Sequence, residues 1–419
     1  MHNVLILGSG GREHTLAWKL AQSPLCENLY IGPGNAGTAS VGTNIYLDIM
    51  NFAEVQKMVD KHDIHYLIVG PEAPLVAGIY DHFKNHKVLV VGPSKAAAQL
   101  EGSKSFANDF MRSFNIPTSA SIDITKENIE EGFDHISKIK GKIVLKADGL
   151  AAGKGVLILD DNAEAQRQLK AMIEGKFGEA SEKVVIEEFL DGVEFSVFVA
   201  TDGKNYKILP IAKDYKRREE GDKGLNTGGM GAISPVPFVD DEMMIKVREH
   251  IIEPTIEGLK IMDYNYKGFI FLGLINIGGD PYVIEYNCRL GDPETEVVIP
   301  RMKNDLMELF VAMHDGSLGD IKIKIRKKAA ATVMLVSEGY PGRYPKGREI
   351  VVDKSMEDSI LFHAGTKKRG HNVLTNGGRV MAITSLAKSH KKAAKKSIEN
   401  IKHVYFKGMQ YRSDIGQDI

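Results

Sequence analysis

Cysteine is nearly absent from this chain of 419 residues, and the two that occur, Cys26 and Cys288, lie far apart. Two cysteines can form neither a disulfide framework nor a four-ligand zinc site. Long apolar runs are also missing, since no segment approaches the roughly eighteen uninterrupted apolar residues of a membrane-spanning helix. The chain enters an apolar strand pattern from Met1 without a basic leader. We therefore expect a cytoplasmic protein of a reducing compartment, with no membrane association.

An excess of charge of one sign is lacking too, because 54 Lys and Arg stand against 55 Asp and Glu. No global field draws the chain to nucleic acid, so phosphate recognition must be local. The histidines form no HxH or HExxH spacing, no Ser-His-Asp arrangement is visible, and His14 and His363 are typical of surface or packing residues. We expect no nucleic-acid partner, and a monomer or weak dimer.

The length and a hydrophobic content of 43% predict roughly two to four compact units. Short apolar runs at 4–7, 66–69 and 88–91 alternate with amphipathic stretches, and each run is closed by Gly or Gly-Pro. Continuous apolar strands separated by helical patterns predict a doubly wound parallel sheet, with ligand loops at the carboxyl ends of its strands. The first domain is therefore expected to be α/β.

The rest of the chain predicts a mixed α/β and α+β multidomain protein. A helix around 127–138 with strands at 143–146 and 183–187 indicates a small α+β subdomain that could move as a lid. The polar run 214–227 is expected to be a long loop, and the last domain to end in a helix over 385–403. The expected units are an N-terminal domain at 1–101, a large domain at 102–325 with its lid at about 117–188, and a C-terminal α+β domain at 326–419.

Residues 146–156 run from a strand into a loop of small residues and back into a strand at 156–159. Glycines let main-chain N–H groups approach phosphate oxygens, and lysines supply point charges. The segment lacks the Ser or Thr and the following helix of a Walker A loop. It indicates a phosphate cover, although an ordinary hairpin turn would give the same local pattern.

Alternation places Glu285 and Asn287 on one face of an expected strand, and Arg289 follows on that face. Two hard oxygen ligands suit Mg²⁺, which completes its octahedron with phosphate oxygens and water. The guanidinium would pair with a phosphoryl group or a substrate carboxylate. A surface strand with a structural Glu-Arg pair would show the same pattern.

Other segments are weaker when each is taken alone. In the loop 8–13, Glu13 stands where the dinucleotide fingerprint has its third glycine, which argues against NAD, but the following helix N-terminus could hold a phosphate. Turn chemistry alone would explain 32–37 and 70–75. The main-chain groups of Glu188 and Leu190 could bond an adenine edge, and the run 214–231 is long enough to be a substrate loop.

Taken in order, these residues resemble the ATP-grasp superfamily and, within it, the phosphoribosylamine–glycine ligases of de novo purine biosynthesis. The resemblance covers essentially the whole chain. It is carried by the segments 8–14, 32–37, 70–76, 101–104, 146–155, 226–235, 285–295, 339–342, 363–366 and 377–380.

The resemblance implies ATP between lid and large domain, with Mg²⁺ or Mn²⁺ on Glu285 and Asn287. The ATP-binding residues it implies are Lys104, Lys146, Gly153, Lys154, Gly155, Glu187, Glu188, Phe189, Leu190 and Glu194. Those implied for the substrates glycine and 5-phosphoribosylamine are Gly10, Gly11, Arg12, Asn35, Gly37, Pro71, Glu72, Asn226, Thr227, Gly228, Gly229, Arg289, Asp292 and Pro293. Catalytic roles are implied for Arg289, Lys216 and Asp214.

The implied reaction needs ATP for a chemical reason. A carboxylate does not accept an amine at neutral pH because its oxygen is a very poor leaving group. ATP would convert glycine to glycyl phosphate, and the amine of 5-phosphoribosylamine would then displace phosphate to form the amide. Catalysis becomes positioning and charge neutralisation.

Three positions depart from the family pattern. Leu290 stands where relatives usually have Phe and Glu296 where they usually have Gln, for which we expect altered packing and retained chemistry. Gly273 takes the place of a metal-binding Asp found in many ATP-grasp enzymes, which leaves Glu285 as the chief carboxylate. The rival readings are a dinucleotide-dependent oxidoreductase, an ATP-grasp carboxylase or formyl-transfer enzyme, and a non-catalytic nucleotide sensor.

Overall fold

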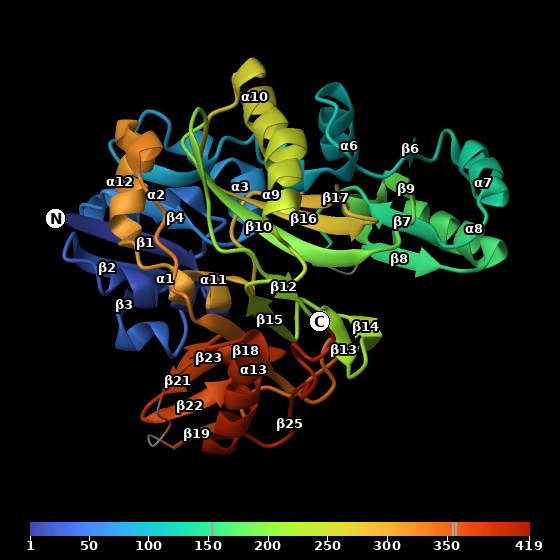
Figure 1. The fold of residues 1–419 in the computed structure, drawn as a ribbon. Helices are drawn as coiled ribbons and strands as arrows, with labels where there is room; N and C mark the ends of the chain where they lie inside the picture. Colours follow the sequence, from blue (N-terminus) through green and yellow to red (C-terminus); the bar gives the residue numbers. More distant parts are fainter. Residues whose placement is uncertain (152–154, 354–355, 357) are drawn as a thin grey trace.

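The structure is a computed structural model that describes residues 1–151, 155–353, 356 and 358–419. The N-terminal domain lies at one end, a lid projects at the other, and the C-terminal domain lies below the sheet between them (Figure 1). Within these described ranges, no helix is long and apolar enough to cross a membrane.

The N-terminal domain is a parallel sheet with strand order β5-β4-β1-β2-β3. Continuous apolar runs form its central strands, and every residue of β4 is buried. The strand order reverses between β1 and β4, so the loops after these strands border the crevice where such sheets bind ligands. The predicted doubly wound fold is confirmed. Its elements are β1 (His2–Gly8), α1 (Gly11–Leu20), β2 (Cys26–Pro33), η1 (Thr38–Ser40), β3 (Thr43–Asn44), α2 (Phe52–Lys61), β4 (Tyr66–Val69), α3 (Glu72–Ala77), α4 (Ile79–His82) and β5 (Leu89–Pro93).

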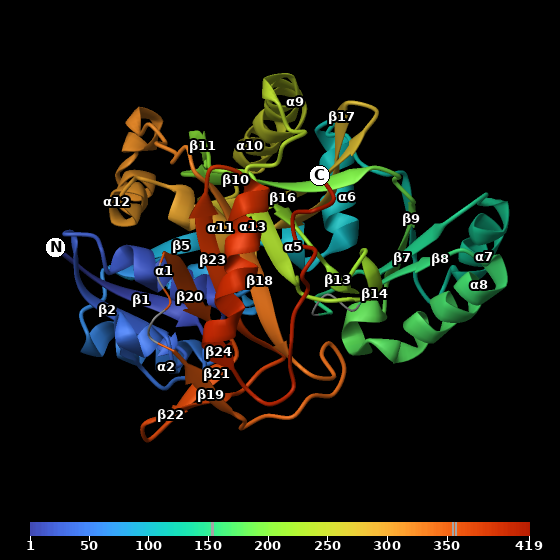
Figure 2. The same cartoon turned by 60° about the horizontal axis from the view of Figure 1, so that its bottom comes forward.

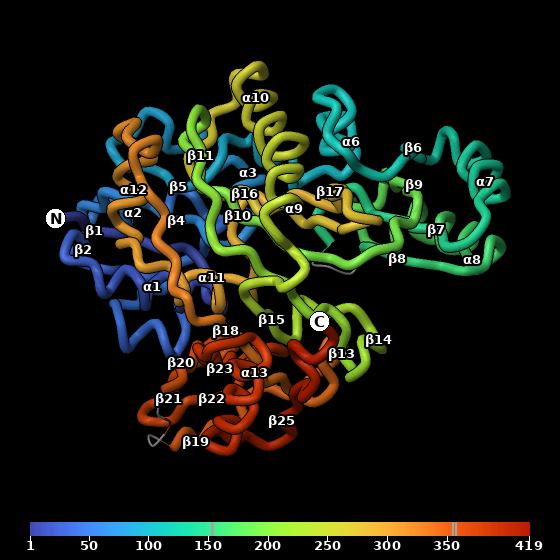
Figure 3. Tube along the Cα trace, in the orientation of Figure 1, coloured from blue at the N-terminus to red at the C-terminus, as the bar shows by residue number. Residues whose placement is uncertain are grey.

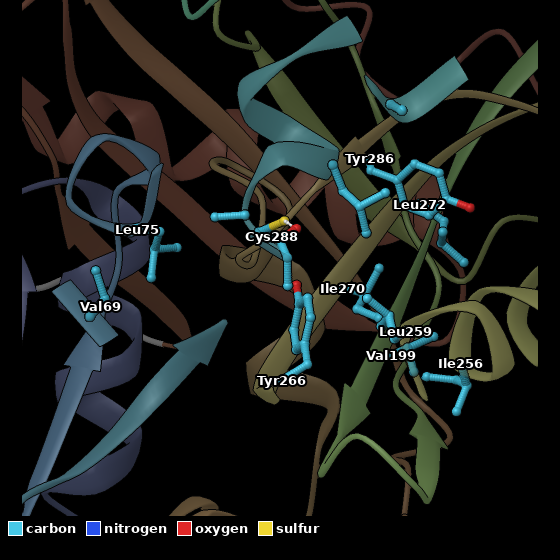
Figure 4. Close-up of a cluster of buried hydrophobic side chains, with 14 of the residues drawn as sticks. Val69, Leu75, Val199, Ile256, Leu259, Tyr266, Ile270, Leu272, Tyr286 and Cys288 are labelled. Carbon is cyan, nitrogen blue, oxygen red and sulfur yellow. Dashed lines mark hydrogen bonds between the residues drawn. The ribbon is translucent and has the colours of Figure 1, made fainter. Parts of the chain in front are cut away.

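The large domain extends this sheet, because β5 pairs antiparallel with β16 through Pro93–Tyr266 and Gly92–Lys267. The result is one nine-stranded sheet. Figure 4 shows apolar side chains of both parts in one core, with Tyr266 lying beside Cys288. The added elements are α5 (Gln99–Gly102), α6 (Lys104–Ser113), β10 (Val193–Thr201), β11 (Tyr206–Ile208), α9 (Asp241–Val247), η4 (Arg248–Ile252), α10 (Glu253–Ile261), β16 (Tyr266–Ile277), β17 (Asp280–Asn287), α11 (Thr295–Arg301), α12 (Leu306–Asp315) and η5 (Ser317–Asp320).

The lid has its own antiparallel sheet in the order β6-β9-β7-β8. Two helices cover it, and side chains such as Leu145, Leu169 and Ile186 form a separate small core. The predicted α+β lid is confirmed, and the helix expected around 127–138 is α7. Its elements are β6 (Ser121–Ile124), α7 (Ile129–Lys138), β7 (Ile143–Ala147), β8 (Val156–Leu159), α8 (Asn162–Ala171), η2 (Met172–Lys176), η3 (Gly178–Ser181) and β9 (Val184–Glu188).

The C-terminal domain is built on a six-stranded sheet, β12-β15-β18-β23-β20, with β25 paired to β18. Figure 2 shows α13 lying across β18 and β23. Strands β12 and β15 precede the rest by about a hundred residues, so this sheet also holds the ends of the segment 214–231. The elements are β12 (Lys213–Asp214), β15 (Gly231–Ser234), β18 (Ala329–Ser337), β19 (Glu349–Val352), β20 (Ser359–His363), β21 (Thr366–Arg369), β22 (Asn372–Thr375), β23 (Arg379–Ala387), α13 (His390–Glu399), η6 (Asn400–His403), β24 (Val404–Tyr405) and β25 (Met409–Gln410).

Two local predictions were wrong. The run 214–227 is not an open loop, since β13 (Arg217–Glu219) and β14 (Lys223–Asn226) form a hairpin whose turn has Gly221 and Asp222 at positive φ. The C-terminal tail lies beside this hairpin (Figure 3), where Asp414 accepts from Gly221 N. The helix expected over 385–403 is shorter, because residues up to 387 belong to β23 and pair with β18.

Candidate active site

Strand β17 carries the predicted metal ligands. Glu285 lies opposite Gly273 of β16, and a Cβ on that glycine would lie 3.0 Å from Glu285 Cγ, so the glycine makes room for the acid. Asn287 is 8% exposed; its Oδ1 accepts from Arg289 Nη2 at 3.0 Å, and its Nδ2 has no hydrogen-bond partner among the described residues. An orphaned buried donor of this kind is commonly satisfied by a bound group.

Lysines from three separate elements converge on Glu285. Burial raises the pKa of this carboxyl, but Lys216, Lys104 and Lys146 outweigh burial and lower the pKa to about 2. Lys104 begins α6, Lys146 lies on the lid strand β7, and Lys216 follows β12. We call Glu285 and these three lysines the nucleotide side of the site. It combines an ionised carboxylate with cations, as a metal–phosphate group requires.

Lys146 joins the lid to β17. Its Nζ lies 2.6 Å from Glu187 Oε2 and donates to Ile284 O at 3.2 Å. The side chains of Lys146 and Glu187 are each 7% exposed. Ser119 Oγ and Asn108 Nδ2 also donate to Glu187, at 3.0 and 3.3 Å. The expected adenine-edge residue is therefore part of a buried network.

The other residues expected to bind ATP lie at or just after the end of β9, or in the glycine loop. Glu188 N already donates to Ala120 O at 2.9 Å, and Lys142 Nζ lies 4.5 Å from the centre of the Phe189 ring, next to Leu190. Gly155 O accepts from Ala147 N at 2.8 Å. Gly153 and Lys154 lie outside the described residues.

Lys216 is surrounded by acids. Its Nζ lies 2.5 Å from Glu194 Oε2, so the residue expected at the ribose is directly paired with a residue expected in catalysis. Burial lowers the pKa of Lys216, but Glu194, Asp214 and Glu285 raise it well above its ordinary value. Burial raises the pKa of Asp214. Burial and then Asp214 raise the pKa of Glu294 to about 8. Glu294 was missed from the sequence because nothing local distinguishes it.

Arg289 lies just beyond the end of β17, where it is held by carboxylates from other segments of the chain. Its Nη2 lies 2.8 Å from Glu101 Oε1, and its Nε lies 3.5 Å from Glu72 Oε2. Glu101 Oε2 accepts from Cys288 N at 2.7 Å, so one buried acid fixes both the end of β17 and the arginine. Glu101 was not predicted as a site residue, although it opens the 101–104 segment of the resemblance. Pro71 precedes Glu72 as the N-cap of α3.

The first turn of α1 is occupied by carboxylates of the chain itself. Glu13 accepts from Gly10 N at 2.5 Å, and Asp292 Oδ2 accepts from Arg12 N at 3.2 Å. Arg12 donates through Nε to Glu13 at 2.6 Å and through Nη1 to Leu290 O at 3.0 Å. A ligand phosphate at this helix end would have to displace these acids, which departs from the sequence expectation.

Asn35 closes the neighbouring loop. It donates to Ser9 O and His363 O, each at 2.9 Å, and accepts from Gly37 N at 2.8 Å. A Cβ on Gly37 would meet His14 Cε1 at 2.4 Å, so close packing requires glycine here. These contacts join the N-terminal loops to the C-terminal domain.

We call four residues the acceptor side of the site, because it includes or adjoins residues expected to bind glycine and 5-phosphoribosylamine. These four residues are Arg12, Asp292, Glu296 and Arg379. Asp292 Oδ1 lies 2.9 Å from Arg379 Nη2. Burial raises the pKa of Asp292, but Arg379 and Arg12 outweigh burial and lower it. Glu296 is fully buried, and neither of its carboxyl oxygens has a hydrogen-bond partner among the described residues. Burial and then Asp292 raise the pKa of Glu296 well above its ordinary value.

The departure at Leu290 coincides with a small void. Leu290 lines a cavity of about 10 Å³ together with Arg12, Leu16, Val91 and Phe269. Leu290 thus lies beside a void, and Glu296 is an unpartnered acid among the described residues.

The sheet, the lid over it and the lysine-surrounded carboxylate define an ATP-grasp protein. The chain matches the family described as phosphoribosylglycinamide synthetase in three parts: the N domain over 2–101, the ATP-grasp (A) domain over 102–295 and the C domain over 330–418. The chain belongs to this family.

Named relatives agree with this membership. The chain is 43% identical over 419 residues to the phosphoribosylamine–glycine ligase of Pasteurella multocida, covering 99% of this chain and 97% of that protein. Identity to the ligase of Vibrio vulnificus strain YJ016 is 44% over 420 residues, again covering 99% and 97%. The crystal structure of the Thermotoga maritima ligase superposes with a TM-score of 0.86 at 36% identity, covering 98% of this chain and 99% of that one.

A more distant likeness shows the fold alone. The biotin carboxylase domain of 2-oxoglutarate carboxylase from Hydrogenobacter thermophilus has a TM-score of 0.75 at 15% identity, covering 98% of this chain and 92% of that one. Family membership favours the ligase over the carboxylase, oxidoreductase and sensor readings.

Proposed function

We propose that this chain is a phosphoribosylamine–glycine ligase that joins glycine to 5-phosphoribosylamine and converts ATP to ADP and phosphate. The observation that carries the proposal is the convergence of Lys104, Lys146 and Lys216 on Glu285 within a chain of this family. Such a site neutralises the charge of a transferring phosphoryl group.

The donor set fits a divalent cation that is shared with a nucleotide. Glu285 is ionised at neutral pH, and Asn287 Oδ1 keeps a second lone pair beyond its bond to Arg289. Among the described residues, no group of three or more His, Cys, Asp or Glu side chains could hold a metal ion. Mg²⁺ is commonly bound by one or two carboxylates plus phosphate oxygens. Mg²⁺ or Mn²⁺ at Glu285 and Asn287 would supply charge neutralisation to the phosphates.

The chemistry then proceeds through glycyl phosphate. The glycine carboxylate takes the γ-phosphoryl group, and the carboxyl carbon gains a phosphate leaving group. The amine nitrogen forms a bond to that carbon, the carbon–oxygen bond to phosphate breaks, and the nitrogen loses a proton. Asp214 is placed beside Lys216, so this pair is suited to receive that proton and to hold the departing phosphate.

The lid supplies the other half of the nucleotide site. Lys146 lies against Glu187 and Ile284 O, and this position brings its charge from β7 to β17. A lid closed over the acyl phosphate would exclude water from it. Glu188 ends β9, Phe189 and Leu190 follow it, and Glu194 lies on β10, in the position proposed for adenine and ribose.

The test is ADP release, measured with glycine alone, with 5-phosphoribosylamine alone and with both, in the presence of Mg²⁺. We expect release to require both substrates and to match glycinamide ribonucleotide formed, by mass spectrometry. Parallel reactions with bicarbonate or formate in place of glycine serve as controls. Release without the amine, or release supported by bicarbonate, would make the ligase assignment wrong.

A further inference from the structure

Arg379, on the C-terminal strand β23, joins the two segments expected to bind substrates. Its Nη1 donates to Asp292 O at 2.6 Å and to Gly228 O at 2.5 Å, and its Nη2 lies 2.9 Å from Asp292 Oδ1. The guanidinium thus donates to a main-chain carbonyl of each of two chain segments that are more than sixty residues apart, and it forms an ion pair with Asp292.

The loop held by Arg379 has no room to move toward its neighbours. A Cβ on Gly228 would lie 3.0 Å from Arg379 Cζ, and one on Gly229 would lie 2.4 Å from Pro293 Cδ. Gly229 also has φ +114°, which other residues rarely adopt. Gly228 N donates to Tyr340 Oη at 2.9 Å. Both main-chain polar groups of Gly228 are therefore fixed by side chains of the C-terminal domain.

Hydrogen bonds carry this fixation as far as the main chain at Lys216, whose side-chain Nζ is held separately by Glu194 at 2.5 Å. Gly229 N donates to Thr227 Oγ1 at 2.9 Å, and Thr227 Oγ1 donates to Lys216 O at 2.7 Å. Thr227 N donates to the same carbonyl at 2.8 Å. The main chain at Lys216 is thus tied to the loop that Arg379 holds.

We propose that Arg379, aided by Tyr340, is a positioning residue for ligation: it sets the loop 226–229 against Asp292 and Pro293, and through them the geometry of the acceptor substrates. This inference rests on the proposed function. Every Arg379 partner named above belongs to the expected substrate segments and none to the expected ATP residues. Loss of Arg379 should misplace the bound glycine and 5-phosphoribosylamine and leave the affinity for the nucleotide intact. A misplacement of about 1 Å can lower the rate about 100-fold.

The experiment compares purified full-length Arg379→Gln, Arg379→Lys and Tyr340→Phe with the wild type. We expect Arg379→Gln to lower kcat/KM for 5-phosphoribosylamine by about tenfold or more, and to keep the Kd for Mg-ADP within about twofold. Arg379→Lys should lower kcat/KM less than Arg379→Gln does. Its kcat/KM should still lie below that of the wild type, because an ammonium lacks the planar N–H groups of the guanidinium. Tyr340→Phe should lose less.

Arg412→Gln is the matched control. Arg412 also lies in the C-terminal domain, pairs with an aspartate, Asp414, at 2.8 Å and donates to a main-chain carbonyl, Arg217 O, at 2.9 Å. Because Arg412 holds the hairpin that follows Lys216, Arg412→Gln should lower the melting temperature and reduce kcat/KM for the amine much less than Arg379→Gln does. If Arg379→Gln does not fold, Arg379→Lys and Tyr340→Phe are measured for the same difference, a lower kcat/KM for 5-phosphoribosylamine with an unchanged Kd for Mg-ADP.

Three results would overturn the inference: unchanged kcat/KM in folded Arg379 variants, a parallel loss of Mg-ADP affinity, or an equal loss of kcat/KM in Arg412→Gln. These differ from failure of the proposed function, which would show in the wild type as ADP release that does not need both substrates.

Discussion

The nucleotide side and the acceptor side of the site differ in what their charges face. On the nucleotide side, three lysines surround one ionised carboxylate, Glu285. On the acceptor side, Asp292 is paired with Arg379 and also accepts from Arg12 N, so charge is balanced within the protein. In the first arrangement Lys146 and Lys216 also pair with acids, at 2.6 and 2.5 Å, whereas the ions of the second hold two chain segments together.

This difference predicts two kinds of mutational response. Removing the charge of Glu285 should remove chemistry with little effect on folding, because the ligand is the partner that is lost. Removing a charge from the acceptor side should change geometry or stability, because the lost partner is another part of the chain.

The largest expected effect is that of Glu285→Ala on turnover. With the metal carboxylate gone, we expect kcat to fall by about 10³-fold or more while the far-UV circular dichroism spectrum stays the same. Glu249→Ala, which alters a side chain that is 53% exposed, is the surface control. Near-normal activity of Glu285→Ala at saturating Mg²⁺ would show that Glu285 is not the metal ligand.

The next effect concerns Lys146, the nucleotide-side residue that also has a buried partner. Lys146→Met leaves Glu187 buried without its cation, which should cost about 3 to 5 kcal/mol in urea unfolding. The double variant Lys146→Met with Glu187→Leu should regain much of that stability and still bind Mg-ATP at least about tenfold more weakly than the wild type. Normal ATP affinity in the double variant would show that this lysine serves the fold alone.

The fold was largely predictable because its signals are local. Continuous apolar runs such as 66–69 indicated the parallel sheet, and alternation placed Glu285 and Asn287 on one face of β17, which ends before Arg289. The hairpin within 214–227 was missed because its strands are polar and short. The helix expected from 385 begins later because Ser385 pairs with residues of β18 and β20, a contact that sequence spacing does not reveal.

The site was predictable only where a residue's role is set by its own segment. Arg379 and Glu101 lie in segments that carry the resemblance, but they act through partners 87 and 188 positions away, Asp292 and Arg289, so no local pattern predicts their roles. The carboxylates at the start of α1 are a similar case. A glycine-rich loop before a helix predicted a phosphate, but the fold brings Asp292 to the N–H of Arg12.

The smallest expected effect tests the acceptor side at its unpartnered acid. Glu296→Gln replaces a fully buried carboxyl group, whose oxygens have no hydrogen-bond partner in the described residues, by a neutral group of the same shape. We expect it to stabilise the protein by at least about 1 kcal/mol at pH 8, measured by urea unfolding. Glu242→Gln, at a side chain 81% exposed, should change stability little.

The pH dependence gives this prediction its sign. Burial and Asp292 raise the pKa of Glu296 in the folded state, so folding favours the protonated form. That contribution is complete below the unfolded-state pKa of about 4.3, and it is lost as pH rises toward the folded-state pKa, at about 1.4 kcal/mol per pH unit. Glutamine does not titrate, so the advantage of Glu296→Gln should be small at pH 5 and grow toward pH 8. An advantage that stays constant between pH 5 and pH 8 would mean that Glu296 is already ionised in the folded state at pH 5, and the acceptor side would then hold a second compensated ion.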